Sequence, residues 1–122
     1  MNVSFVVDGQ PVPKARARAG RGGVHYTPEK TRSYERRVGV NRFREEYLKY
    51  GDDWPMDKRY RVTVCAYFSD RRNRDLDNVL KSVLDGLNKH AYHDDRQVDD
   101  MRIVRAYDKQ NPRVSVLVEV IA

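Results

Sequence analysis

The middle of this sequence reads Arg71-Arg72-Asn73-Arg74-Asp75-Leu76-Asp77-Asn78-Val79-Leu80-Lys81, and this stretch decides the expected chemistry and much of the expected fold. Two carboxylates, Asp75 and Asp77, stand one residue apart among arginines. Carboxylates are ligands for a hard divalent cation, and arginines bind phosphate. Apolar residues then recur at helical spacing and predict a helix from Asn78 to about Lys89: Val79, Leu80, Val83, Leu84 and Leu87. We therefore expect a phosphodiester bond to bind where this helix begins.

The start of this helix has a second property that suits phosphate. Asp75 or Asp77 can accept hydrogen bonds from the free N–H groups of the first turn, and the helix start carries partial positive charge. Lys81 lies four residues after Asp77, about 5.4 Å along the helix, so its ammonium can reach a group held there. The structural alternative is an ordinary cap, a surface ion pair worth roughly 0.2–0.5 kcal/mol and solvated arginines. All these features fall within eleven residues, which favours function.

The flanking segments predict strands and one further helix. Alternating or apolar runs predict strands over 3–7, 60–68, 101–107 and 114–120, with a short strand at 24–26. A helix is expected from Pro28 to about Tyr50, with Thr27 as its cap and Gly51 as its stop. Its inward positions are expected to be Tyr34, Val38 and Leu48.

Composition narrows the class of protein. The 122 residues fit a single domain, and the net charge of +6 predicts a polyanionic partner, most often nucleic acid. The one cysteine, Cys65, rules out a disulfide within the chain and is expected to be a buried core thiol. There is no signal peptide and no apolar run long enough for a membrane, so a cytoplasmic protein is expected.

A basic segment near the N-terminus is a second candidate DNA contact. Small residues alternate there with bases: Lys14, Arg16, Arg18 and Arg21. In an extended backbone Lys14, Arg16 and Arg18 would point the same way, which suits a phosphate backbone. An exposed loop without a partner is the equally weighted alternative.

A second acidic pair, Asp94-Asp95, stands just before an extended apolar segment. Two groups of carboxylates at the ends of elements are what a metal site needs. Asp99 and Asp100 follow closely, so spacing alone leaves the register of the second pair open. His93 is a possible ligand or general base, although a lone loop histidine is more often incidental.

Taken together, the motifs resemble the RusA family of Holliday-junction resolvases of bacteria and their prophages. The resemblance lies in Asp75-Leu76-Asp77-Asn78 with Lys81, in Asp85 with a leucine two residues on, and in Asp94-Asp95-Arg96-Gln97-Val98. The segments 11–16 and 26–28 also resemble phage-type members. The resemblance implies an α+β domain over 1–122, with a small mixed sheet and two main helices, that works as an intertwined or closely packed homodimer.

The resemblance also implies roles for single residues. It makes Asp75, Asp77 and Asp95 the essential acids, Asp94 an accessory acid and Lys81 the essential lysine. It settles the register on Asp94-Asp95. The implied cofactor is Mg²⁺, one or two ions per subunit with Mn²⁺ as a substitute, and no small-molecule cofactor. The implied reaction is paired nicking of branched DNA at a four-way junction.

From these roles follows an expected mechanism. The acids would hold metal that activates water and neutralises the charge on the phosphate. Lys81 would stabilise the transition state or protonate the leaving group. Arg71, Arg72 and Arg74 would seat the flanking phosphates, together with the basic segment that contains Lys14.

Three other classes of protein share part of this pattern of residues. A non-catalytic module that binds branched DNA predicts that Asp75→Asn has no functional consequence. A nucleotide-sugar transferase with an Asp-x-Asp motif needs a larger chain. A calcium-binding EF-hand loop requires a glutamate at its twelfth position, where this sequence has Gly86.

Overall fold

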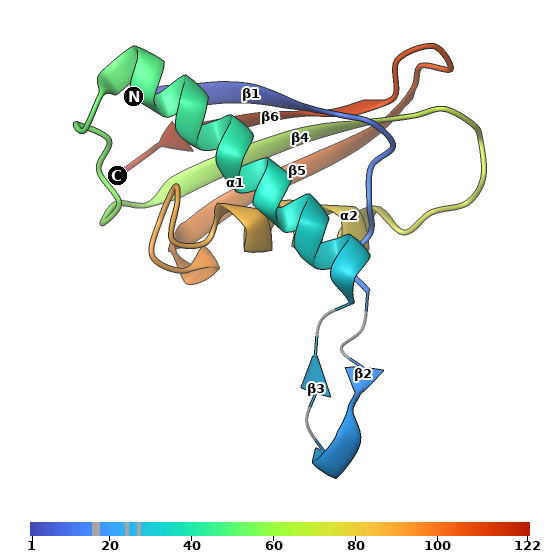
Figure 1. Ribbon diagram of the computed structural model, residues 1–122. Helices are drawn as coiled ribbons and strands as arrows, with labels where there is room; N and C mark the ends of the chain where they lie inside the picture. Colours follow the sequence, from blue (N-terminus) through green and yellow to red (C-terminus); the bar gives the residue numbers. More distant parts are fainter. Residues whose placement is uncertain (16–17, 24, 27) are drawn as a thin grey trace.

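The computed structural model describes residues 1–15, 18–23, 25–26 and 28–122, and its two helices cover one face of a four-stranded mixed sheet (Figure 1). This confirms the expected α+β class. In chain order the elements are β1 (Asn2–Asp8), β2 (Arg18–Ala19), the 3₁₀ helix η1 (Arg21–Gly23), β3 (His25–Tyr26), α1 (Glu29–Tyr50), β4 (Tyr60–Phe68), α2 (Leu76–Leu87), the 3₁₀ helix η2 (Asp95–Gln97), β5 (Val98–Tyr107) and β6 (Arg113–Val120).

The sheet has the strand order β1-β6-β4-β5, and only β4 and β5 run parallel. Strand β4 alternates as predicted, because its residues from Tyr60 to Phe68 at even positions are buried under the helices. Cys65 points to the opposite face and is partly exposed, so the expectation of a buried core thiol is wrong. The reason is that both helices cover the same face, which leaves the other face of the sheet uncovered.

Helix α2 packs its apolar stripe fully into the core, as the spacing predicted. Its bounds differ from the prediction by two residues at each end, since it begins at Leu76 and ends at Leu87. It begins early because Asp75 takes the N-cap position. It ends early because Asn88 leaves the helical conformation and Lys89 has a positive φ of 66°.

Helix α1 lies across the sheet and contacts both β1 and α2. Tyr34 and Val38 are buried as predicted, and the Gly51 N–H bonds to the carbonyl of Tyr47 where the helix ends. Leu48 is 73% exposed, so its predicted inward position is wrong. The fully buried position of the helix's second half is instead Arg42. The predicted cap, Thr27, lies outside the described residues.

A ribbon of β2 and β3 projects from the body of the domain, below the sheet in Figure 1. It follows the N-terminal segment that contains Lys14. The part of the chain that the structure describes has no helix with the length and apolarity needed to span a bilayer.

The two helices meet closely at Gly86. A Cβ atom at this position would lie 2.7 Å from Cβ of Val38 and 2.9 Å from the carbonyl oxygen of Glu35. Neither of these atoms belongs to the free end of a flexible side chain. The glycine therefore allows α1 to pack against α2.

We expect Gly86→Ala to destabilise the fold. Overpacking costs on the order of 1–3 kcal/mol, which outweighs the gain of about 1 kcal/mol from alanine's helix propensity. Gly39→Ala is the matched control on the facing helix, because its Cβ would meet mainly the exposed side chain of His90, with the Gly86 carbonyl oxygen farther away at 3.3 Å. Urea denaturation of both variants tests this, and equal stabilities would contradict the close contact at Gly86.

Candidate active site

The start of α2 is organised by Asp75. This residue is the N-cap, and its carboxylate accepts hydrogen bonds from the Asp77 N–H at 2.9 Å and from Nδ2 of Asn78 at 3.3 Å. The sequence left Asp75 and Asp77 open as caps, and the structure selects Asp75. The carboxylate of Asp77 is exposed in the first turn of the helix. Both acids therefore lie at the positive end of the helix dipole.

The arginines before α2 are of two kinds. Arg71 and Arg72 are exposed, and the guanidinium of Arg71 lies 4.2 Å from the centre of the Tyr107 ring. Arg74 is 17% exposed and binds Asp70 through two hydrogen bonds, 2.6 and 3.3 Å long. The hydrogen bond from Arg74 lowers the pKa of Asp70 to about 2. Arg74 thus shapes the loop, whereas the other two present their charge to solvent.

The second acidic pair begins η2. Asp94 is its N-cap and accepts the Arg96 N–H at 2.9 Å, which lowers the pKa of the Asp94 carboxyl. Gln97 completes a capping box by accepting the N–H of Asp94. The Asp95 carboxylate is partly exposed and lies 3.5 Å from the ammonium of Lys81. The structure therefore brings Lys81 and Asp95 together.

Tyr92 explains how Asp95 comes to lie beside α2. The Tyr92 side chain is fully buried, and its hydroxyl donates a 3.0 Å hydrogen bond to the carbonyl of Leu84. Burial raises the pKa of this hydroxyl, which keeps it protonated as a donor. The tyrosine thus ties the chain after α2 back onto the helix. The sequence showed a bulky residue here but not its purpose.

Asp99 and Asp100 lie apart from this group. Asp99 binds Arg59, which directly precedes β4, and Asp100 binds Arg61 on β4. The spacing of acids left two registers open, and in the structure only Asp95 of the competing residues pairs with Lys81.

Two further acids, Asp85 and Glu35, join the site, although neither was assigned a role from the sequence. Lys81 also lies 3.5 Å from Asp85, which in turn lies 3.1 Å from the ammonium of Lys14. Lys14 forms a second pair with Glu35 at 2.5 Å. Burial opposes the charge on Lys14, but the hydrogen bonds that its ammonium donates to Glu35 and Asp85 outweigh this effect, so the pKa of Lys14 is raised. The four-residue spacing of Lys81 and Asp85 could have predicted their ion pair from the sequence. No pattern in the sequence indicated that Glu35 would join the site.

The predicted acids do not form a compact cluster. Within residues 1–15, 18–23, 25–26 and 28–122, no three His, Cys, Asp or Glu side chains lie close enough to hold a metal ion. Lys81 pairs with Asp85 and Asp95, and no ion pair joins it to Asp77 among the described residues. The expectation that Lys81 reaches a group at the helix start stays a prediction.

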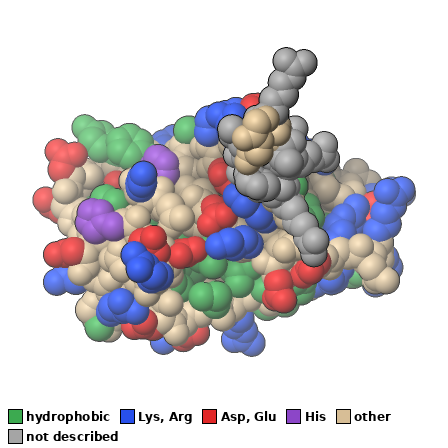
Figure 2. All heavy atoms as spheres, turned by 90° about the horizontal axis from the view of Figure 1, so that it is seen from below, with side chains coloured by type: hydrophobic (Ala, Val, Ile, Leu, Met, Phe, Trp, Pro, Cys, Tyr) green, Lys and Arg blue, Asp and Glu red, His purple; other side chains and the backbone are tan. Residues whose placement is uncertain are grey.

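Part of the predicted DNA surface lies outside the structure's description. Arg16 lies outside the described residues, and of Arg18 and Arg21 only the backbone is described. Lys14 is described, and its ammonium is engaged with two carboxylates. Seen from the underside, the molecule mixes acidic side chains with lysines and arginines (Figure 2).

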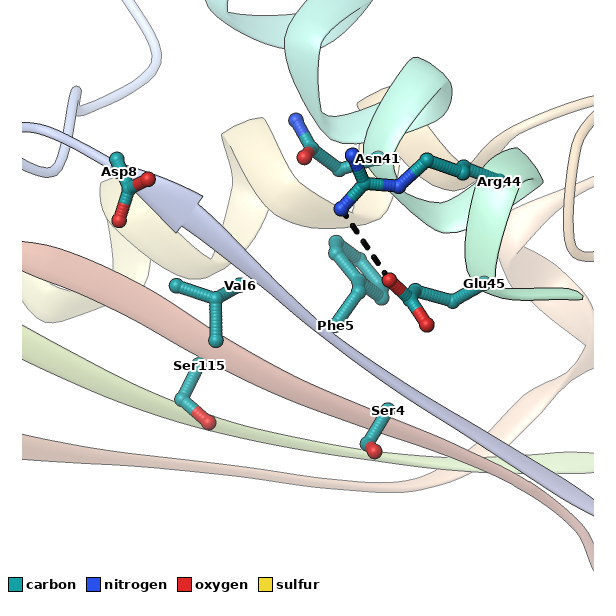
Figure 3. Close-up of a pocket in the computed structure, with 8 residues that line it drawn as sticks. All are labelled: Ser4, Phe5, Val6, Asp8, Asn41, Arg44, Glu45 and Ser115. Carbon is teal, nitrogen blue, oxygen red and sulfur yellow. Dashed lines mark hydrogen bonds and ion pairs between the residues drawn. The ribbon is translucent and has the colours of Figure 1, made fainter. Parts of the chain in front are cut away.

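A hollow between β1 and α1 lies elsewhere on the molecule (Figure 3). Its polar lining includes Asp8, Asn41 and the ion pair of Arg44 with Glu45. None of the predicted site residues lines it. A second hollow borders the site around α2, and its lining includes Glu35, Asp85 and His90.

This fold and this set of residues belong to a known class of nuclease domain. The model of the RusA endodeoxyribonuclease family matches residues 8–119, so the chain belongs to that family. This confirms the resemblance seen in the sequence.

Two relatives illustrate the match. The crossover junction endodeoxyribonuclease RusA of Enterobacteria phage HK97 is 32% identical over 97 residues, which cover 79% of this chain and 77% of that protein. The uncharacterized protein YqaN of Bacillus subtilis (strain 168) is 28% identical over 135 aligned positions, which cover 95% of this chain and 94% of that protein.

Proposed function

We propose that this protein is a metal-dependent endonuclease that resolves four-way DNA junctions by paired nicks. The family match and the name of the HK97 relative support the reaction class. The observation that carries the proposal is the position of Lys81. This lysine lies on α2, the helix that Asp75 caps, and its ammonium is 3.5 Å from the carboxylate of Asp95. A cation beside a carboxylate on the helix that Asp75 caps suits a phosphodiester substrate.

The donor groups of the site are of the chemical type that a hard divalent cation binds, although these acids do not form a compact cluster in the described part of the chain. Asp75, Asp77 and Asp95, with Asp94 as an accessory, offer the carboxylate oxygens that Mg²⁺ and Mn²⁺ prefer. Each carboxylate has about four lone-pair sites, so the hydrogen bonds that Asp75 already accepts leave it able to bind a cation. Such an ion, when bound, supplies positive charge against the charge that develops on the phosphate.

Residues of the chain itself do the rest. Lys81 places a second positive charge beside Asp95, where it stabilises a negative transition state or donates a proton to the leaving oxygen. Arg71 and Arg72, exposed before α2, bind flanking phosphates together with the basic segment near the N-terminus. Arg74, bound to Asp70, sets the shape of the loop that presents them.

Paired cuts require two such sites. A four-way junction has approximate two-fold symmetry, and a homodimer with two-fold symmetry places one site on each of two opposed strands. We therefore propose a homodimer as the active form.

A nicking assay tests the proposed function. With Mg²⁺, the protein is expected to cut a synthetic four-way junction at two opposed strands and to leave a linear duplex of the same sequence intact. EDTA is expected to abolish cutting and to leave junction binding measurable by gel shift. Tight binding without cutting in Mg²⁺ or Mn²⁺ would refute the enzyme and support a branched-DNA-binding module.

A further inference from the structure

Five side chains of alternating charge form a continuous row across the domain. The row runs from Glu35 on α1 to Lys14, then to Asp85 and Lys81 on α2, and ends at Asp95 on η2. Successive partners are 2.5, 3.1, 3.5 and 3.5 Å apart. Each inner member therefore contacts two groups of opposite charge.

Asp85 is the unusual member of this row. It lies in the last turn of α2, where the helix dipole disfavours an acid. A lysine four residues before an acid is also the weaker order for a helical ion pair. Asp85 is nevertheless only 17% exposed, so its charge is held by its neighbours and not by water alone. Its ion pairs with Lys14 and Lys81 offset this unfavourable position.

The two oxygens of Asp85 have separate partners. Oδ2 faces Lys14 and Oδ1 faces Lys81. Lys14 is itself fixed, since its backbone N–H bonds to the Asn78 carbonyl at 2.8 Å and its ammonium binds Glu35. Asp85 is thereby held in one orientation, in which the oxygen that does not contact Lys14 faces Lys81.

At Asp95, the ammonium of Lys81 and a divalent cation would compete for the same carboxylate. An ammonium beside a carboxylate opposes the binding of a divalent cation to that carboxylate. A second carboxylate on the same ammonium offsets part of this opposition. In the structure Asp85 is that second carboxylate, and the two oxygens are equally far from Lys81.

We propose that Asp85 is a positioning residue that shares the ammonium of Lys81 with Asp95 and so keeps Asp95 available to a divalent cation. Lys14 and Glu35 support it by fixing its orientation. This inference rests on the proposed function, because it assumes that Asp95 binds the metal. It assigns a role to a link between α1 and α2 that lies outside the predicted catalytic set.

Calorimetric titration of the whole protein with Mg²⁺ tests the proposal without DNA. Asp85→Asn, nearly the same size as aspartate, is expected to weaken Mg²⁺ binding on the order of tenfold, as the loss of a supporting partner does at metal sites. Lys81→Met is expected to bind Mg²⁺ at least as tightly as the wild type. The double variant is expected to match Lys81→Met, because the effect of Asp85 acts through Lys81.

Single-turnover nicking gives a second readout. Asp85→Asn is expected to lower the rate at a fixed low Mg²⁺ concentration and to recover as Mg²⁺ is raised, with junction binding unchanged. The control is Asp100→Asn, which removes an acid paired with Arg61 at 2.8 Å on β5 and is expected to match the wild type. If Asp85→Asn does not fold, Lys14→Met tests the same row and is expected to shift Mg²⁺ binding in the same direction.

The outcomes separate the two proposals. If the wild type binds neither Mg²⁺ nor Mn²⁺, the metal chemistry of the proposed function fails, and this inference fails with it. If the wild type binds Mg²⁺ and Asp85→Asn binds it equally well, only the role of Asp85 is refuted. The role of Asp85 is also refuted if Asp85→Asn lowers the Mg²⁺ affinity of the Lys81→Met variant as much as it lowers that of the wild type. Asp85 would then act independently of Lys81.

Discussion

Replacing Asp75 by asparagine is expected to slow the nicking of a four-way junction by at least about 100-fold, equivalent to about 2.7 kcal/mol of activation free energy. The charge of a carboxylate that we propose as a metal ligand is lost, while the cap is kept, since asparagine is as good an N-cap as aspartate. The side-chain oxygen of asparagine can still accept the Asp77 N–H. The variant therefore separates chemistry from folding at this position.

The measurement is single-turnover nicking in Mg²⁺, with a thermal melt and a gel shift on the same preparation. Asp52→Asn, in the exposed loop after α1, removes one charge elsewhere and is expected to leave all three unchanged. An Asp75→Asn protein that nicks at the wild-type rate would show that Asp75 serves only as a cap, as the branched-DNA-binding module predicts.

Glu46→Gln is expected to lower the free energy of unfolding by about 3–5 kcal/mol, because it leaves a buried charge without its counterion. The buried charge belongs to Arg42, which is fully buried, bonds to Glu46 and lies 4.6 Å from the centre of the Trp54 ring. Burial lowers the pKa of Arg42, and the interaction with Glu46 opposes this. Two of its guanidinium nitrogens have no hydrogen-bond partner within the described chain, so Glu46 is its main support.

Urea denaturation measures this effect against a matched control. Glu45→Gln changes the neighbouring glutamate, whose pair with Arg44 is exposed, and is expected to cost less than about 1 kcal/mol. Replacing both members of the buried pair, Arg42→Met with Glu46→Leu, is expected to restore most of the stability. If Glu46→Gln costs no more than Glu45→Gln, the charge of Arg42 must be stabilised in another way.

Local patterns predicted the elements with a continuous period. The strand Tyr60–Phe68 was predicted with both ends correct, because alternation runs unbroken through it. The strand β5 was predicted to start at Met101, but it starts at Val98. The acids Asp99 and Asp100 hid its first residues, since their arginine partners, Arg59 and Arg61, lie just before and on the neighbouring strand β4.

Helix α1 shows why burial on a charged helix is hard to predict. Its polar and apolar residues are spread around the axis, so the sequence did not indicate which face turns inward. The inward face is set by contacts with β1 and with Trp54, which are distant in sequence. For this reason Leu48 was predicted to be buried and is exposed, whereas the buried Arg42 was not anticipated.

The candidate site shows the same division. The residues around the start of α2 predicted that Asp75 or Asp77 caps the helix, and the structure selects Asp75. The contact between Lys81 and Asp95 depends on the buried Tyr92, which turns the chain back onto α2. Glu35 reaches the site only because Gly86 lets α1 pack against α2. Such tertiary contacts leave no periodic trace in the sequence.

The parallel pairing of β4 with β5 places nearly every candidate catalytic residue in the single connection between these strands, residues 69–97. This connection can pass between relatives as one inherited block, by recombination within a short stretch of the gene. A chimera that receives the block acquires the acids and Lys81 but keeps its own Lys14 and Glu35. Compatibility between block and host would then depend on two residues that lie far from the block in sequence.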